Sequence, residues 1–220
     1  MPARRRKSQR KLNPRFVQLC LILVLLVLTA AVFWALLANR GAEAEGVEVP
    51  AYVVQDFIPV NEWSRPGTEL KKIDGVVIHY VGNPGTTAEA NRNYFASLAS
   101  GKEGTFASSH FVVGLNGEVI QCIPMTEVAY ASNERNDDTV SIEVCHPDET
   151  GEFSSVTYDR LVELTAWLCQ TFDLDPEEQV IRHYDVTGKV CPKYYVENPE
   201  AWEAFQADTA KKLYEFSENS

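Results

Sequence analysis

The longest apolar run in the chain lies near its N-terminus, between residues 16 and 38. Its 23 residues carry no charge, and Gln18 and Thr29 are the only clearly polar side chains in it. A helix that crosses a bilayer core requires about 20 consecutive apolar residues, so this run predicts one transmembrane helix. The rest of the chain alternates between short apolar and polar segments, which is typical of a folded domain.

Three segments beyond this run have strand patterns. Residues 73–80 form a β-branched run that ends in the turn-rich sequence GNPGTT, and this suits a buried central strand. The apolar segments on either side of Asn116-Gly117 predict a hairpin, because this dipeptide favours a two-residue turn. In residues 139–145 aliphatic and other side chains alternate, so Glu143 is expected on the face opposite the aliphatic row.

Three other segments have the apolar spacing of helices. They comprise residues 86–98, residues 157–172 and residues 198–213, and in the last of these Asn198 is a good N-cap followed by Pro199. Strands interleaved with helices predict the α/β class. The expected architecture is a central mixed β-sheet flanked by helices and preceded by one N-terminal transmembrane helix.

Charge is distributed unevenly around the apolar run. Seven Lys or Arg residues and no acid precede it, whereas Arg40 and then Glu43, Glu45 and Glu48 follow it. The positive-inside rule therefore predicts a single-pass protein of the cell membrane, with a cytoplasmic N-terminus and an extracytoplasmic domain. A cleaved signal peptide is the alternative, since residues 42–44 read Ala-Glu-Ala, although the apolar run is longer than a signal h-region.

These patterns divide the chain into four parts: a basic tail at 1–15, a signal-anchor at 16–38, a linker at 39–51 and one domain at 52–217. About 165 residues are enough for a single packed core. Residues 47–220 carry 12 basic and 29 acidic side chains, a net charge of −17. Because such a surface repels phosphate backbones, nucleic acid is not expected as a partner.

Histidine and cysteine residues of the domain offer one metal-binding combination. A catalytic zinc takes three protein ligands, and two histidines with one cysteine are an accepted set. His79 ends a predicted strand, His183 follows the apolar pair Val180-Ile181, and Cys191 can return to both through the loop between them. Taken alone, each histidine is more simply explained as a structural residue and Cys191 as a buried thiol.

Other residues leave alternatives open for this site. His146, Cys122 or Cys145 as a fourth ligand would make the zinc site structural rather than catalytic. Cys122 and Cys145 are also candidates for a disulfide if their strands are neighbours. Cys169 is expected in the core of a helix.

Lys189 and Glu143 are candidates for chemistry beside such an ion. Lys189 lies two residues before Cys191, and its ammonium could stabilise an oxyanion, although a solvated surface lysine is the ordinary alternative. Glu143 is unusual because strands disfavour glutamate. It could take a proton from an attacking water, or it could be an exposed residue of a one-sided sheet.

Four sequence motifs occur in order along the domain: IHYVGNPG, SSHFVVGLNGEVIQCIP, SIEVCHPD and RHYDVTGKVCP. Together they closely resemble the zinc-dependent N-acetylmuramoyl-L-alanine amidases, the family that includes phage-lysozyme-type amidases and peptidoglycan recognition proteins, over about residues 60–215. The resemblance implies a mixed sheet flanked by helices and one zinc ion held by His79, His183 and Cys191. It also implies hydrolysis of the amide between N-acetylmuramic acid and the L-alanine of the peptidoglycan stem peptide, with Lys189 at the position of the family's catalytic lysine.

One position distinguishes the branches of this family. Phage-type members have a tyrosine immediately before the histidine of the hairpin strand, where this chain has Ser109 before His110. The other branch has a small residue there and a glutamate in the IE motif, so the resemblance assigns the general-base role to Glu143 and a structural role to His110. The alternative function is a membrane-tethered, non-catalytic peptidoglycan-binding module, but such relatives typically lack the cysteine ligand, which is present here as Cys191.

Overall fold

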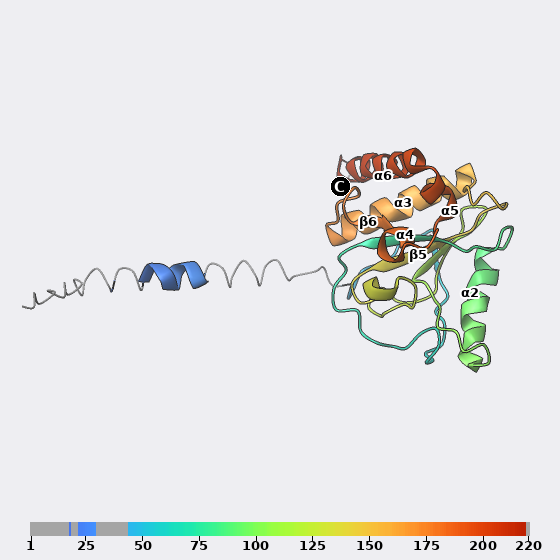
Figure 1. Cartoon of the computed structure of the whole chain (residues 1–220), viewed down its shortest axis with the longest axis horizontal. Helices are drawn as coiled ribbons and strands as arrows, with labels where there is room; N and C mark the ends of the chain where they lie inside the picture. The colour runs from blue at the N-terminus through green and yellow to red at the C-terminus, as the bar shows by residue number, and fades with distance from the viewer. Residues whose placement is uncertain (1–17, 19–21, 30–43, 219–220) are drawn as a thin grey trace, which may run out of the picture. The chain divides into compact units, whose positions relative to one another are not determined.

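The computed structural model describes residue 18, residues 22–29 and residues 44–218 of the chain (Figure 1). The chain has two compact units, Met1–Arg40 and Gly41–Ser220. In the first unit, residues 22–29 are helical. Among the described residues, no helix combines the length and the hydropathy that a bilayer crossing requires. The predicted basic tail and most of the predicted transmembrane segment 16–38 lie outside these residues.

A six-stranded sheet forms the centre of the second unit, with the strand order β1-β4-β3-β5-β2-β6. The strands are β1 (Val53–Gln55), β2 (Val76–Tyr80), β3 (Phe111–Val113), β4 (Val119–Gln121), β5 (Val140–Val144) and β6 (Val180–Arg182). β3 and β4 are antiparallel, and all other neighbouring strands of this sheet are parallel. The prediction of a mixed sheet is therefore confirmed.

The antiparallel pair is the hairpin that Asn116-Gly117 predicts. Gly117, between β3 and β4, has a φ of +78°, a left-handed conformation that glycine adopts without steric cost. A Cβ atom at Gly117 would also lie 3.1 Å from a methyl group of Val156. Close packing and backbone conformation together explain the glycine in this turn.

Helices precede and follow the strands. The α-helices are α2 (Ala88–Ser97), α3 (Ser155–Phe172), α4 (His183–Thr187), α5 (Lys193–Glu197) and α6 (Pro199–Glu218), and the 3₁₀ turns are η1 (Leu98–Ser100) and η2 (Asn133–Arg135). The Thr87 hydroxyl caps α2 by accepting a hydrogen bond from the Ala90 amide. Pro199 is the first residue of α6, as predicted, because a helix N-terminus does not require the amide hydrogen that proline lacks.

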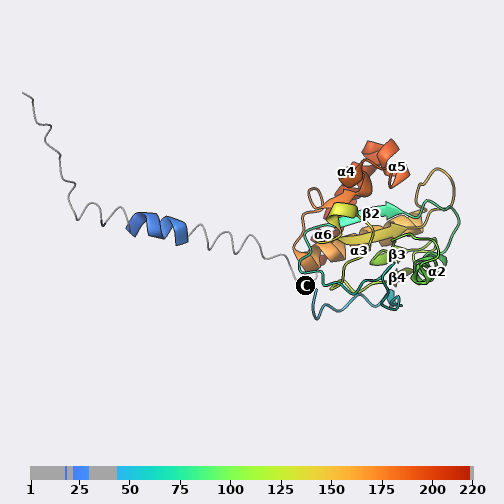
Figure 2. The same ribbon diagram turned by 60° about the horizontal axis from the view of Figure 1, so that its bottom comes forward.

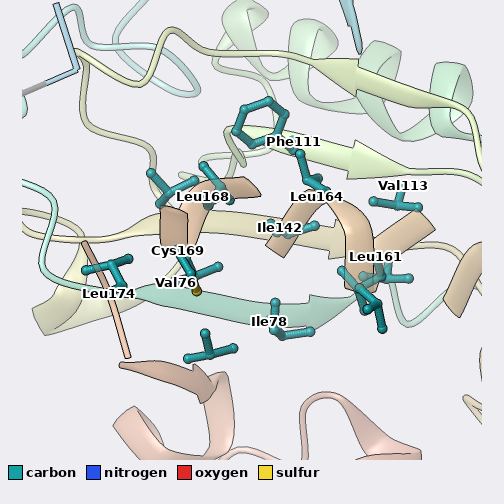
Figure 3. Packing of buried hydrophobic residues seen from close by; sticks show 14 of the residues in the cluster. Val76, Ile78, Phe111, Val113, Ile142, Leu161, Leu164, Leu168, Cys169 and Leu174 are labelled. Carbon is teal, nitrogen blue, oxygen red and sulfur yellow. The ribbon is translucent and has the colours of Figure 1, made fainter. Parts of the chain in front are cut away.

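The two faces of the sheet are covered by different helices. On one face, aliphatic side chains of β2 and β5 pack with α3, and Leu161, Leu164 and Leu168 of α3 lie over Ile78 and Ile142 (Figure 3). α6 packs against α3 and adds aromatic side chains to this core. α2 belongs to a second cluster, on the opposite face (Figure 1). The expected architecture of a sheet flanked by helices is therefore observed.

The start of the domain differs from the prediction. Residues 39–51 were expected to form a linker, but Ala44 is buried and Val47 and Val49 pack against the main core cluster. Packing against the core removes the apolar surface of these side chains from water, which is favourable. The described part of the predicted linker, 44–51, therefore packs with the domain.

The strand register decides which residues reach the site. His79 of β2 is directly paired with Glu143 of the parallel strand β5, so both side chains project from the same face of the sheet. This face is opposite the aliphatic row of Val140, Ile142 and Val144, as the alternation predicts. β6 pairs with β2 on its other side, and α4 and α5 follow it next to each other (Figure 2).

Candidate metal centre

The three residues predicted as metal ligands converge at one point. His79 lies near the end of β2, His183 is the first residue of α4 directly after β6, and Cys191 follows α4. One potential ligand atom from each residue lies within 4.8 Å of the other two, and all three residues are buried. The two imidazole rings have centroids 4.6 Å apart, and Cys191 Sγ is 3.9 Å from His79 Nδ1.

The short helix α4 returns the chain to the histidines. It ends at Thr187 and is capped by Gly188, which has a left-handed φ of +76° and whose amide donates to the Tyr184 carbonyl. The Tyr184 amide in turn donates to the Cys191 carbonyl over 2.9 Å. These bonds close the loop and bring Cys191 back beside His183.

The histidine rings present the same nitrogen to the centre. His79 Nε2 is 3.1 Å from Ser132 Oγ, and His183 Nε2 is 3.1 Å from Asn133 Oδ1. The Nδ1 atom of His183 is buried and has no hydrogen-bond partner among the described residues. His79 Nδ1 faces Cys191 and Glu143. A buried ring nitrogen without a partner is the feature that a metal ion would satisfy.

The protonation states of the histidines also suit a metal. Burial lowers the pKa of His79 well below its ordinary value, and the charges of His183 and Lys189 act in the same direction. Burial and the charge of Lys189 likewise lower the pKa of His183. Metal binding requires neutral imidazole, so both rings are in the state that binds. Two imidazole nitrogens and one cysteine sulfur are a donor set that fits zinc.

Burial affects the Cys191 thiol in the opposite sense. It raises the pKa of Cys191 to about 12, and the nearby Glu143 carboxyl adds to this increase. A coordinating cation reverses this preference because it stabilises the thiolate. The thiol is therefore inert by itself and suited to a bound cation.

Glu143 brings a carboxyl group next to these residues. Its Oε1 atom is 4.0 Å from His79 Nδ1 and its side chain is 18% exposed, so it is not the exposed strand residue of the alternative interpretation. Burial raises the pKa of Glu143 to about 8, although the positive charge of Lys189 lowers it. A carboxyl group with a pKa near neutrality can both accept and return a proton.

Lys189 brings positive charge to the same place. Its side chain is exposed and contributes to the cavity above the ligands. Its electrostatic effect reaches His79, His183 and Glu143, whose pKa values it lowers. The structure therefore brings the predicted lysine to the metal-binding residues.

A cavity of about 380 Å³ opens over this group. Its walls include aromatic side chains and two asparagines from segments far apart in the sequence: Tyr80, Phe95, Phe106, Tyr130, Asn133 and Asn136. Phe106 stacks on Trp63 with ring centroids 4.6 Å apart and meets the edge of Tyr130 at 5.5 Å. The cavity gives a substrate access to all five predicted site residues.

The residues considered as alternative ligands lie outside the cluster. His146, Cys122 and Cys145 are not among the three residues whose ligand atoms converge. Nδ1 of His146 is 2.7 Å from the Asp148 carbonyl oxygen. Cys122 and Cys145 are free, buried thiols and do not form the disulfide that was considered. Cys169 lies in the helix core as expected.

His110 is buried but has a different environment. Its Nδ1 is 3.0 Å from Ser141 Oγ, and its Nε2 is 2.9 Å from the Glu127 carbonyl oxygen. Both ring nitrogens are thus engaged within the protein, which agrees with a structural role. Ser132 and Asn133, in contrast, contact His79 and His183. The sequence offered no signal for these two residues because they lie in a turn without periodicity.

Within the described part of the chain, a mixed α/β domain brings two histidines and one cysteine together in a buried group that opens to a cavity. This arrangement is typical of α/β proteins that bind one metal ion. Within this class, the chain belongs to the N-acetylmuramoyl-L-alanine amidase family known as Amidase_2, whose family model matches residues 69–194. The matched segment contains His79, Glu143, His183, Lys189 and Cys191.

Several known proteins are similar to this chain. The N-acetylmuramoyl-L-alanine amidase BlyA of Bacillus subtilis (strain 168) is 32% identical over 177 residues, which cover 71% of this chain and 46% of BlyA. The structure of the catalytic domain of XlyA has a TM-score of 0.60 and 25% identity, and the match covers 71% of this chain and 98% of that domain. The structure of PlyL shares the fold, with a TM-score of 0.61 at 21% identity over 71% of this chain and 96% of PlyL. The chain spans about half the length of the curated relatives that it matches.

Proposed function

We propose that this chain hydrolyses the amide bond between N-acetylmuramic acid and the L-alanine of the stem peptide in peptidoglycan, with one zinc ion at His79, His183 and Cys191. The observation that carries the proposal is the convergence of these three ligand atoms beneath a cavity that also holds Glu143 and Lys189. Membership of the N-acetylmuramoyl-L-alanine amidase family supplies the reaction.

Glu143 performs the proton transfers of this reaction. When bound, zinc supplies a Lewis acid that polarises the scissile carbonyl and lowers the pKa of the attacking water. The Glu143 carboxylate accepts a proton from that water and returns it to the departing nitrogen of L-alanine. Its position 4.0 Å from His79 Nδ1 places the carboxylate next to the ligands.

Lys189 stabilises the negative charge that develops on the substrate oxygen. Because Cys191 would bind as a thiolate, less positive charge remains at the centre than with three neutral histidines. The ammonium group of Lys189 compensates for this difference, and a donor of this kind contributes about 100-fold or more to turnover.

Digestion of purified peptidoglycan by the full chain tests the proposal. We expect release of stem peptides with L-alanine at the N-terminus, identified by amine labelling and mass spectrometry. A chelator should abolish the release, and added zinc should restore it. Sedimentation with peptidoglycan in the absence of cleavage would overturn the enzymatic function in favour of a binding module. A product with another N-terminal residue would assign a different bond.

We propose in addition that residues 16–38 anchor the chain in the cell membrane, with residues 1–15 in the cytoplasm and the domain outside. The uncharged apolar run and the seven cations that precede it support this topology. We expect the membrane fraction to contain the chain with an intact N-terminus. We also expect protease added to intact spheroplasts to cleave the domain, because the domain lies outside the membrane. A mature chain that begins near residue 45 would show a cleaved signal peptide instead.

A further inference from the structure

Two consecutive residues contact the Nε2 atoms of both ligand histidines, on the side of each ring away from Cys191. Ser132 Oγ is 3.1 Å from His79 Nε2, and Asn133 Oδ1 is 3.1 Å from His183 Nε2. The two histidines are 104 positions apart in the chain, yet a single turn serves both. This turn, η2, contacts α4.

The chemistry of these contacts selects one tautomer of each ring. An amide oxygen can only accept a hydrogen bond, so His183 Nε2 carries the hydrogen and His183 Nδ1 keeps a free lone pair. The Ser132 hydroxyl can accept in the same way from His79 Nε2. Both Nδ1 lone pairs are then available on the side where Cys191 Sγ lies.

The turn itself is held by other bonds. Asn136 Oδ1 accepts hydrogen bonds from the amides of Ala131 (3.0 Å) and Ser132 (2.6 Å). The Arg135 amide donates to the Ser132 carbonyl over 3.0 Å. Asn133 has a φ of +52°, a left-handed conformation that asparagine and aspartate tolerate better than other non-glycine residues. The backbone that carries the two side chains is thus held by bonds within the turn.

We infer that Ser132 and Asn133 are positioning residues that fix the Nε2–H tautomers of His79 and His183 and direct both Nδ1 atoms to the same metal ion. The inference rests on the proposed zinc site and adds which residues orient its histidine ligands. Partners of this kind orient ligand histidines and typically change metal affinity by about 10- to 100-fold when they are removed.

Four variants of the full chain separate this role from a structural one. Asn133→Gly removes the acceptor and keeps the left-handed backbone, Asn133→Asp retains the acceptor, and Ser132→Ala removes the buried hydroxyl. Glu134→Ala is the control, since Glu134 is exposed in the same turn. Zinc dissociation constants are measured by competition with a chromophoric chelator. We expect a loss of about 10- to 100-fold for Asn133→Gly and for Ser132→Ala, and values within threefold of wild type for Asn133→Asp and Glu134→Ala.

Nitrogen-15 NMR of the metal-free chain reads the tautomers directly. In the wild type, His183 and His79 should each show protonated Nε2 and unprotonated Nδ1. Asn133→Gly should produce a mixture at His183 alone, and Ser132→Ala a mixture at His79 alone. Unchanged tautomers, or unchanged zinc affinity in both removal variants, would overturn the inference. A wild-type chain that binds no zinc would instead overturn the proposed metal site, and the NMR result would still decide the tautomers.

Discussion

The two faces of strands β2 and β5 differ in the kind of side chain that they carry and in their contact with solvent. On one face, Val76, Ile78 and Ile142 are fully buried in the main core cluster under α3. On the other face, the neighbouring positions hold His79 and Glu143, which are paired across the strands and open to a cavity. Residues adjacent in sequence therefore contribute either to the apolar core or to the polar site at the cavity.

The difference shows how stability and chemistry are separated within one sheet. Burial of aliphatic side chains is favourable in any orientation that excludes water. Buried polar groups are costly unless each finds a partner, and on the cavity face some groups have none. Glu143 Oε2 and His183 Nδ1 lack hydrogen-bond partners among the described residues. The polar groups on the cavity face therefore lower the stability of the fold, but they remain available to bind a metal ion and a substrate.

Loss of the thiol ligand should be the most damaging change on the cavity face. In Cys191→Ser, the poorly acidic hydroxyl replaces the thiolate that zinc requires, so metal and hydrolysis should both be lost. Elemental analysis should show zinc falling from one ion per chain to near zero, with peptidoglycan release at the level of the chelator-treated wild type. A variant that keeps a full equivalent of zinc would contradict ligation by Cys191. Serine Oγ occupies a position similar to that of cysteine Sγ. The metal-free variant should therefore unfold at nearly the same urea concentration as the metal-free wild type.

Substitution of the carboxyl group should separate metal binding from turnover. Glu143→Gln keeps the shape of the side chain but cannot take up the proton, so turnover should fall by about 100- to 10,000-fold. Zinc content should stay at one ion per chain, because Glu143 is not among the three converging ligands. Steady-state rates of stem-peptide release and elemental analysis on the same preparation provide the measurement. Hydrolysis at a near-normal rate would exclude Glu143 as the general base.

A cavity on the core face should have the reverse effect. Leu164 is fully buried in α3 against the sheet (Figure 3), and Leu164→Ala should lower the free energy of unfolding by about 2 to 5 kcal/mol. Urea unfolding of the metal-free full chain measures this loss. Zinc affinity and turnover per folded molecule should remain within about twofold of wild type. If turnover fell as far as in Glu143→Gln, the two faces would not be independent.

The same contrast explains what the sequence could predict. The alternation of Val140, Ile142 and Val144 with polar residues correctly placed Glu143 on the cavity face, because strand periodicity is local. The residues alone offered the grouping of His79 with His183 as one possibility, and the resemblance to a known family made it specific. The grouping requires the parallel pairing of strands about a hundred residues apart, which no local pattern predicts.

Contacts made by irregular segments were not predictable in this way. Ser132 and Asn133 reach the histidines from a turn whose position depends on side-chain bonds from Asn136. Val47 and Val49, assigned to a linker from their composition, pack on a core that only the tertiary structure provides. The contacts of Ser132 with His79 and of Asn133 with His183, like those of the two valines with the core, join segments far apart in the sequence and leave no period in it.

His110 provides a further comparison, because it is a buried polar residue outside the converging ligands and both of its ring nitrogens contact groups of the protein. Burial lowers the pKa of His110 to about 4, whereas an unfolded histidine has a pKa of about 6.5. Between these values the unfolded chain binds more protons, so the contribution of His110 to stability is complete above pH 6.5 and is lost as the pH falls towards 4. The shift corresponds to a loss on the order of 3 kcal/mol.

The variant His110→Gln should remove this part of the pH dependence. At pH 7 it should be less stable than the wild type, because the bonds to Ser141 and to the Glu127 carbonyl are disturbed. At pH 4 the difference should shrink, because the wild type then also loses stability through protonation of His110. Urea unfolding of both metal-free chains from pH 7 to pH 4 measures the gap. A gap that stays constant or widens would show that the pKa of His110 is not lowered in the folded protein. Since His110 lies outside the converging ligands, the zinc affinity of the folded variant at pH 7 should match that of the wild type.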